Sequence, residues 1–381
     1  MDYALGDDAA ALRQQLRDLM KTHLPEKFHG AFTDDPRDLA TTEAFCRLLA
    51  KEGLLTLAWP KEYGGGGGSV WQQTVVREEM WAAHEPRGAQ YMGVNWVGPA
   101  IMRYGTAEQK ATHLGAISAG EVIWCQGFSE PEAGTDLASL RTRAVRDGDE
   151  WVINGQKIWT SYALMAQWCV LATRTEPVDG SSGRHTLFLI PMDRAGVTAR
   201  PIRSMLGPHH LNEVFFDNVA ATDADILGEV GGGWQVIREA LAFERVGIAR
   251  YARCESLLER LRVELGEQWD ELAESIRTRW ARALVDLRVA RLLAYRAVSL
   301  FDDPAAPAAA SSARIAATTC DQKVAELLFD ALGAAAMDAK PDAVLDGAID
   351  DHWRYAQAAT VASGTIEVQR MLVARELLGG R

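Results

Sequence analysis

WCQGFSEPEAGTDLASL, from Trp124 to Leu140, lies where the chain changes from a helical to a β-rich pattern. The segment concentrates hydroxyl side chains, small residues and backbone donors in what its composition predicts to be a turn. Such a turn can wrap a planar polar ligand, or it can be a structured loop capped by Asp136. The residues alone leave both interpretations open.

The chain ahead of this segment has a helical pattern. Leu12, Leu16 and Leu19 recur at helical spacing, and residues 7–57 and 70–121 are predicted to be helical. The glycine-rich stretch from Trp59 to Ser69 predicts a loop between them. Thr106, followed by Glu108–Gln109, is typical of a helix start.

The chain after the segment is first β-rich and then helical again. Short apolar runs over residues 150–219 predict strands, and Asn154–Gly155 predicts a hairpin turn. Beyond Gly231–Gly233 the sequence is rich in helix-forming residues, which predicts helices over 234–263, 266–301, 309–337 and 342–378. Segregated helices and strands predict an α+β fold with an antiparallel β-domain, not a βαβ fold.

This order of elements predicts three domains. They are an N-terminal helical domain over 1–121, a middle β-domain over 122–232 and a C-terminal helical domain over 233–381. The glycines at 64–68 do not fit a dinucleotide-binding fingerprint, because no strand leads into them and the G-x-G-x-x-G spacing is missing.

Composition excludes several classes of function. A net charge of −12 and a pI near 5.2 argue against nucleic acid as the main partner. The five cysteines are odd in number and widely spaced, so we expect reduced thiols, no metal site and a cytoplasmic location. The sequence has no secretion signal and no apolar run of membrane-spanning length, so we expect no membrane association.

A second segment with candidate functional residues is GQKIWTS, from Gly155 to Ser161. Trp159 stands beside two hydroxyl residues, Thr160 and Ser161. Its ring could be a stacking platform for a planar ligand, although a tryptophan in a β-domain is more often part of the core.

Together, four segments resemble the acyl-CoA dehydrogenase family over nearly the whole chain. They are the two segments above, Trp59–Gly65, and Gly364–Leu378 with its Gly-Thr-Ile-Glu-Val-Gln-Arg sequence. The resemblance implies an N-terminal helical domain, a middle β-domain and a C-terminal four-helix bundle. It also implies an oxidoreductase that uses FAD to introduce an α,β-double bond into a CoA thioester.

The resemblance also implies which residues contact FAD. Gln126 to Ser129 should border the pyrimidine end of the flavin, Thr135 the pyrophosphate, Trp159 the ring and Ser161 the N5 atom. Donors at these places stabilise the electron density that the flavin gains on reduction. The complete implied set is Gln126, Gly127, Phe128, Ser129, Gly134, Thr135, Trp159, Thr160, Ser161, Thr365 and Glu367.

The catalytic base departs from the commonest family pattern. Many members carry a glutamate directly before the C-terminal Gly-Thr, but here Ser363 precedes Gly364, and serine cannot be that base. Other members place the glutamate before an arginine on an earlier helix, which here matches Glu244–Arg245. Arg245, Ser363 and Gly364 are then expected to contact the substrate.

Residue chemistry supports Glu244 independently. It shares helical spacing with Ile237, Leu241 and Ile248, so its carboxylate would lie in an apolar stripe. Burial there would raise its pKa toward the range that suits a base at neutral pH. The alternative is a glutamate that reaches an arginine of another helix or the solvent.

Two segments that family members use to hold a neighbour's FAD look absent. The expected R-x-x-F-G region runs from Arg262 to Glu271 without Phe-Gly, and Q-x-x-G-G is replaced by Asp330 to Ala334. A second, different dehydrogenase-like chain would then complete the site in an α2β2 tetramer; a homotetramer that grips FAD differently is the alternative.

Substrate and electron acceptor follow only from the resemblance. The sequence as a whole is most similar to actinobacterial dehydrogenases of steroid-CoA esters. This resemblance implies a bulky acyl group and an electron-accepting flavoprotein. Two rival functions stay open: an acyl-CoA oxidase, and an inert structural subunit of a dehydrogenase complex.

Overall fold

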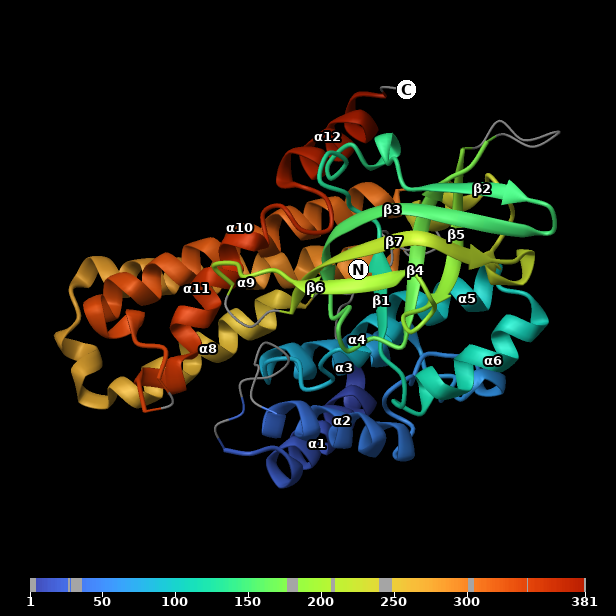
Figure 1. The fold of residues 1–381 in the computed structure, drawn as a ribbon. Helices are drawn as coiled ribbons and strands as arrows, with labels where there is room; N and C mark the ends of the chain where they lie inside the picture. The colour runs from blue at the N-terminus through green and yellow to red at the C-terminus, as the bar shows by residue number, and fades with distance from the viewer. Residues whose placement is uncertain are drawn as a thin grey trace. The chain divides into compact units, whose positions relative to one another are not determined.

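The computed structural model describes residues 5–26, 28, 36–176, 184–206, 210–239, 249–300, 305–340 and 342–379 (Figure 1). The chain divides into two compact units. The first combines Met1–Gly30, Ser69–Pro86 and Glu244–Arg381, and the second combines Ala31–Gly68 with Arg87–Phe243. These units group distant parts of the chain, so they differ from the three consecutive domains that the sequence predicts. The boundaries of those domains stay a prediction.

The first unit is helical. Its long helices are α1 (Gly6–His23), α3 (Val70–Ala82), α8 (Arg250–Leu265), α9 (Glu274–Ser299), α10 (Ala306–Leu332), α11 (Ala348–Ala358) and α12 (Ile366–Leu378). Helix α10 packs against α8, α9, α11 and α12, and α8 also contacts α3. Leu257, Leu258 and Leu261 of α8 are fully buried, as helical spacing toward one face requires.

The predicted helix over 342–378 is interrupted in the structure. Helix α11 ends at Ala358, and α12 begins only at Ile366. Ser363 and Gly364 between them have positive φ angles of 58° and 88°. A left-handed backbone cannot continue a right-handed helix, so this pair separates the two.

A buried carboxylate joins the helices of the first unit. Glu78 on α3 accepts hydrogen bonds of 2.8 Å from the hydroxyls of Tyr251 on α8 and Tyr295 on α9. Arg13 on α1 pairs with the same carboxylate. A charge buried in this way is tolerated only when several partners surround it, and here they come from three other helices.

The second unit is built around one mixed sheet. Within the described residues its eight strands are β1 (Trp124–Gly127), β2 (Arg143–Asp147), β3 (Glu150–Ser161), β4 (Trp168–Arg174), β5 (His185–Pro191), β6 (Val197–Pro201), β7 (Leu211–Ala221) and β8 (Ile226–Leu227). Their order is β6-β7-β3-β2-β4-β5-β8, with β1 beside β4 (Figure 1). Most pairs are antiparallel, as the sequence predicts, while β1 and β2 run parallel to β4, so the sheet is mixed.

The second unit also contains α-helices. They are α2 (Pro36–Lys51), α4 (Gln90–Met92), α5 (Gly98–Tyr104) and α6 (Ala107–Ser118), with a π-helical turn over Gly93–Val97. The predicted helix start at Thr106 is confirmed: its hydroxyl accepts from the Gln109 amide N–H in a capping box. No helix in the described ranges is both long and apolar enough to cross a membrane.

The predicted hairpin turn at Asn154–Gly155 is wrong. Strand β3 continues through both residues, and the turn lies earlier, at Gly148–Asp149, because Asp147 pairs with Glu150. Gly155 has a different reason to be glycine. A Cβ atom there would lie 2.7 Å from the Thr142 Cα atom, so the neighbouring backbone approaches too closely for a side chain.

Candidate active site

The two sequence segments that carry the implied flavin residues lie side by side in the second unit. The Ile158 N–H donates to the Ser129 carbonyl over 2.9 Å, and Lys157 Nζ donates to the Phe128 carbonyl over 3.0 Å. Gln126–Ser129 and Trp159–Ser161 therefore meet at one place, although about 30 residues separate them in sequence. The structure thus brings together the two halves of the predicted flavin-ring contacts.

A buried ion pair fixes this junction. Lys157 Nζ lies 2.8 Å from Glu130 Oε1, and neither side chain is more than 7% exposed. Glu130 also accepts from the backbone N–H groups of Arg141 and Thr142. Burial opposes the charge of Glu130, but Lys157 and the backbone donors lower the pKa of its carboxyl, while burial lowers the pKa of Lys157. Sequence reasoning missed this pair, which joins the turn to β3.

Trp159 is exposed and its backbone is unusual. The residue is 54% exposed, and its φ angle is 60°. The register of β3 against β7 shifts between Lys157 and Thr160, so Trp159 sits in a β-bulge. A left-handed tryptophan is rare and often marks a functional position. The interpretation of Trp159 as core is wrong, whereas its stacking on a ligand stays a prediction.

The hydroxyl residues after Trp159 differ in environment. Thr160 is buried, and among the described residues its Oγ1 atom has no hydrogen-bond partner. Ser161 is half-buried at the end of β3, next to this unsatisfied hydroxyl. A buried hydroxyl without a protein partner is uncommon in a folded chain and is consistent with a group that bonds a ligand.

The remaining cofactor residues of the second unit are accessible to different degrees. Gln126 on β1 and Ser129 are half-buried, whereas Gly127 and Phe128 are buried. Gly134 and Thr135 are exposed in the loop that follows. The exposed Trp159 ring, the Thr160 hydroxyl and the accessible loop backbone are groups that a flavin and its phosphates can use, so the residues present fit FAD.

The C-terminal candidates form the start of α12 in the first unit. Thr365 Oγ1 accepts from the Val368 N–H and caps this helix. Glu367 is exposed in the first turn, where the backbone N–H groups and the Thr365 hydroxyl lower the pKa of its carboxyl. Ser363 and Gly364 are half-buried in the left-handed turn before the cap.

Glu244 and Arg245 lie outside the described residues, so their roles stay predictions.

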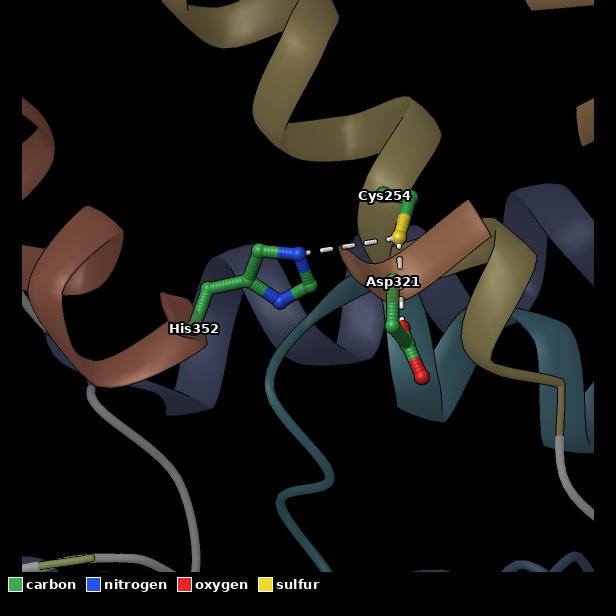
Figure 2. Close-up of side chains that lie close together, drawn as sticks. All are labelled: Cys254, Asp321 and His352. Atoms are coloured by element: carbon green, nitrogen blue, oxygen red, sulfur yellow. Dashed lines mark hydrogen bonds between the residues drawn. The ribbon is translucent and has the colours of Figure 1, made fainter. Parts of the chain in front are cut away.

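Sequence reasoning also missed a buried polar cluster in the first unit. Cys254 on α8, Asp321 on α10 and His352 on α11 lie close together (Figure 2). Cys254 Sγ lies 3.3 Å from Asp321 Oδ1 and 3.8 Å from His352 Nε2. The three residues are far apart in sequence, and their spacing matches no metal-binding motif. No local sequence pattern therefore predicts this cluster.

The chemistry of this cluster favours a hydrogen-bonded junction of helices. Arg250 donates to Asp321 over 3.1 Å, so the carboxylate already has a cation. Burial and the charge of Arg253 lower the pKa of His352 to about 4, and burial raises the pKa of the Cys254 thiol. A protonated thiol and nearby guanidinium groups do not favour a divalent cation. The prediction that the chain has no metal site stays a prediction.

Three family models match the chain in sequence order. They are the N-terminal domain of acyl-CoA dehydrogenases over residues 6–121, the middle domain over 125–219 and the C-terminal domain over 231–378.

Individual relatives and solved structures agree with these matches. Acyl-CoA dehydrogenase IpdE1 of Mycobacterium tuberculosis is 36% identical over 368 residues, which cover 93% of this chain and 90% of the relative. The solved structure of the Tcur3481-Tcur3483 steroid ACAD is 33% identical with a TM-score of 0.90, covering 100% of this chain and 99% of that chain. The ChsE4-ChsE5 complex from Mycobacterium tuberculosis is 32% identical with a TM-score of 0.87 and the same coverage. The chain therefore belongs to the acyl-CoA dehydrogenase family of FAD-dependent oxidoreductases.

Proposed function

We propose that this protein dehydrogenates a bulky, steroid-derived acyl-CoA thioester between its α- and β-carbons, with Glu244 as the base. The observation that carries the proposal is the junction of the two flavin segments, where Lys157 ties Phe128 and Glu130 to the strand that exposes Trp159. A rigid strand that presents an aromatic face beside donors is what a flavin ring needs.

The cofactor residues of the second unit have distinct proposed tasks. Gln126 and Ser129 donate to the pyrimidine edge of the flavin, Trp159 covers a face of the ring, and Thr160 and Ser161 supply hydroxyls near N5. Gly134 and Thr135 border the phosphates. In the first unit, Thr365 and Glu367 make the C-terminal contacts. When bound, FAD supplies the acceptor for the hydride that leaves the β-carbon.

The proton chemistry falls to residues of this chain. The proton beside a thioester carbonyl is weakly acidic, so a carboxylate must remove it. Glu244 is the proposed base because Ser363 cannot fill that role, and Arg245 follows it as a substrate contact. As the proton leaves, the thioester oxygen gains negative charge, and the Ser363 N–H is the proposed donor that stabilises it.

The acyl group and the partner are proposed from chemistry and likeness together. A serine in place of the usual carboxylate leaves space beside the thioester, and a similar solved structure is that of a steroid ACAD. Two similar solved structures are named as pairs of proteins, Tcur3481-Tcur3483 and ChsE4-ChsE5. We propose an α2β2 tetramer with a second dehydrogenase-like chain, and an electron-accepting flavoprotein as oxidant.

The residue that replaces a family glutamine supports this asymmetry. Asp330 near the end of α10 pairs with Arg279 on α9 over 2.5 Å. Its carboxylate is therefore engaged within its own subunit, and a carboxylate near a neighbour's FAD phosphates would repel them. This chain would serve a neighbouring flavin poorly, as the α2β2 proposal requires.

Replacement of the base tests the mechanism. Glu244→Gln keeps the size of the side chain but loses its basicity, so anaerobic flavin reduction should slow by at least about 10²-fold. FAD content should stay normal, and Ser363→Ala, which keeps the backbone donor, is the matched control with a mild effect. Rapid flavin reduction by Glu244→Gln would remove Glu244 from the mechanism.

The substrate needs a screen of CoA thioesters that includes steroid side-chain esters. The dehydrogenase should be yellow, bleach with its substrate under anaerobic conditions and re-oxidise slowly in air. Fast production of peroxide would instead indicate an oxidase. A colourless protein, even in the presence of its partner chain, would indicate a structural subunit.

A further inference from the structure

A buried arginine holds the turn that contains Ser363. Arg314 on α10 is 3% exposed, and its Nη2 atom donates to the carbonyls of Ala359 over 3.2 Å and Ala362 over 2.9 Å. Carbonyls at the end of a helix lack partners within the helix, and a cation near that end is also favoured by the helix dipole. Arg314 therefore stabilises the exit from α11.

The bond to Ala362 has a second consequence, because a peptide unit is planar. The described residues contain no cis peptide bond, so the carbonyl of Ala362 and the N–H of Ser363 point in opposite directions within one peptide plane. Since Arg314 takes the carbonyl, the Ser363 N–H must face away from the guanidinium. Arg314 thus sets the direction of the donor proposed for the thioester oxygen.

Other contacts hold the next two peptide units. Gln369, fully buried on α12, places its Nε2 atom 3.5 Å from the Ser363 carbonyl and 3.3 Å from the Gly364 carbonyl. The Ile366 N–H donates to the Thr360 carbonyl over 3.1 Å. The carbonyls of the turn are thus held from two sides, which maintains the left-handed backbone at Ser363 against its intrinsic cost.

We infer that Arg314 is a positioning residue for the thioester oxygen, acting through the Ala362–Ser363 peptide; the inference rests on the proposed function. It orients the Ser363 N–H and, by polarising the same peptide, makes that N–H a stronger donor. Because the donor is a backbone N–H held by Arg314, this part of the site does not require a carboxylate side chain at position 363.

The test uses the FAD-loaded complex and two variants. Arg314→Lys keeps a cation but loses the planar guanidinium that holds the donor in place, and Arg314→Gln removes the charge. Arg253→Gln is the matched control. Arg253 is also a buried arginine that holds α11, through Asp351 over 2.6 Å, but Asp351 lies in the first turn of that helix, whereas the Ala362–Ser363 peptide follows its end.

Two measurements separate positioning from general stability. The first is kcat for the best CoA thioester of the screen. The second is the ratio of dissociation constants for the enoyl-CoA product and for an S-alkyl CoA in which CH2 replaces the carbonyl. Loss of one oxyanion donor typically slows catalysis by about 10²–10³-fold. A misdirected donor should therefore lower kcat by at least about 10-fold. It should also reduce the carbonyl preference, which is the degree to which the enoyl-CoA binds more tightly than the S-alkyl CoA.

Both kcat and the preference for the carbonyl compound should decrease from wild type to Arg314→Lys to Arg314→Gln. Arg253→Gln should keep the wild-type ratio of dissociation constants. If Arg314→Gln fails to fold, Arg314→Lys alone decides. A wild-type carbonyl preference and kcat in a folded Arg314 variant, or an equal loss in Arg253→Gln, would overturn the inference. A wild-type complex whose flavin is reduced by none of the CoA thioesters in the screen would instead refute the proposed function.

Discussion

The Lys157–Glu130 pair gives the sharpest prediction about what holds the flavin segments together. Replacing Lys157 by Met removes its hydrogen bond to the Phe128 carbonyl and leaves the Glu130 carboxylate buried without its cation. Breaking a buried ion pair by removing one partner typically costs about 3–5 kcal/mol. The lost hydrogen bond to the Phe128 carbonyl accounts for about 1 kcal/mol of this loss of stability. The buried Glu130 carboxylate without its cation accounts for most of the rest.

Urea denaturation followed by tryptophan fluorescence, together with FAD content, measures this loss. Lys157→Met should unfold at lower urea and retain less FAD. Its stability should recover as the pH falls, because an unpaired buried carboxyl has a raised pKa and becomes neutral on protonation. Adding Glu130→Gln should restore most of the stability in a double-mutant cycle. A single variant within about 1 kcal/mol of wild type would refute the reasoning, since stranding a buried charge costs more than that.

Three further predictions concern other parts of the molecule. Trp159→Ala should weaken FAD binding roughly 10-fold with little change in apoprotein stability, because the ring is exposed; fluorescence titration checks this, and unchanged affinity would reject the stacking role. Burial lowers the pKa of His352 from 6.5 to about 4, so its protonation favours the unfolded chain and stability should fall as pH drops through this window. The loss should be roughly 3 kcal/mol in total, and His352→Phe should flatten the pH profile of Tm. Native mass spectrometry of the chain expressed alone should find it poor in FAD, whereas a stable homotetramer with four bound FAD and full turnover would reject the α2β2 proposal.

Local sequence patterns determined much of this protein. Helical spacing of leucines predicted helices near the start of the chain, a high content of helix-forming residues predicted those after Gly233, and the Thr106 capping box was readable because its partners lie three residues apart. The residues of the flavin segments carried the family resemblance, and the absence of a glutamate before Gly364 was visible directly. Each of these features depends on neighbours within one or two turns of the chain.

Long-range contacts decided the rest. Asn154–Gly155 became part of a strand because β3 pairs with β7 across it, and the bulge in the same pairing exposes Trp159. Cys254, Asp321 and His352 meet only because α8, α10 and α11 pack together, as Figure 2 shows.

The same distinction applies at the thioester site. The sequence shows that Ser363 cannot be a base, but it does not show which way the N–H of Ser363 points. That direction depends on Arg314, 49 residues earlier, whose guanidinium takes the opposite end of the same peptide. A hydrogen bond between distant residues leaves no periodic trace in sequence, because its geometry exists only once the helices have packed.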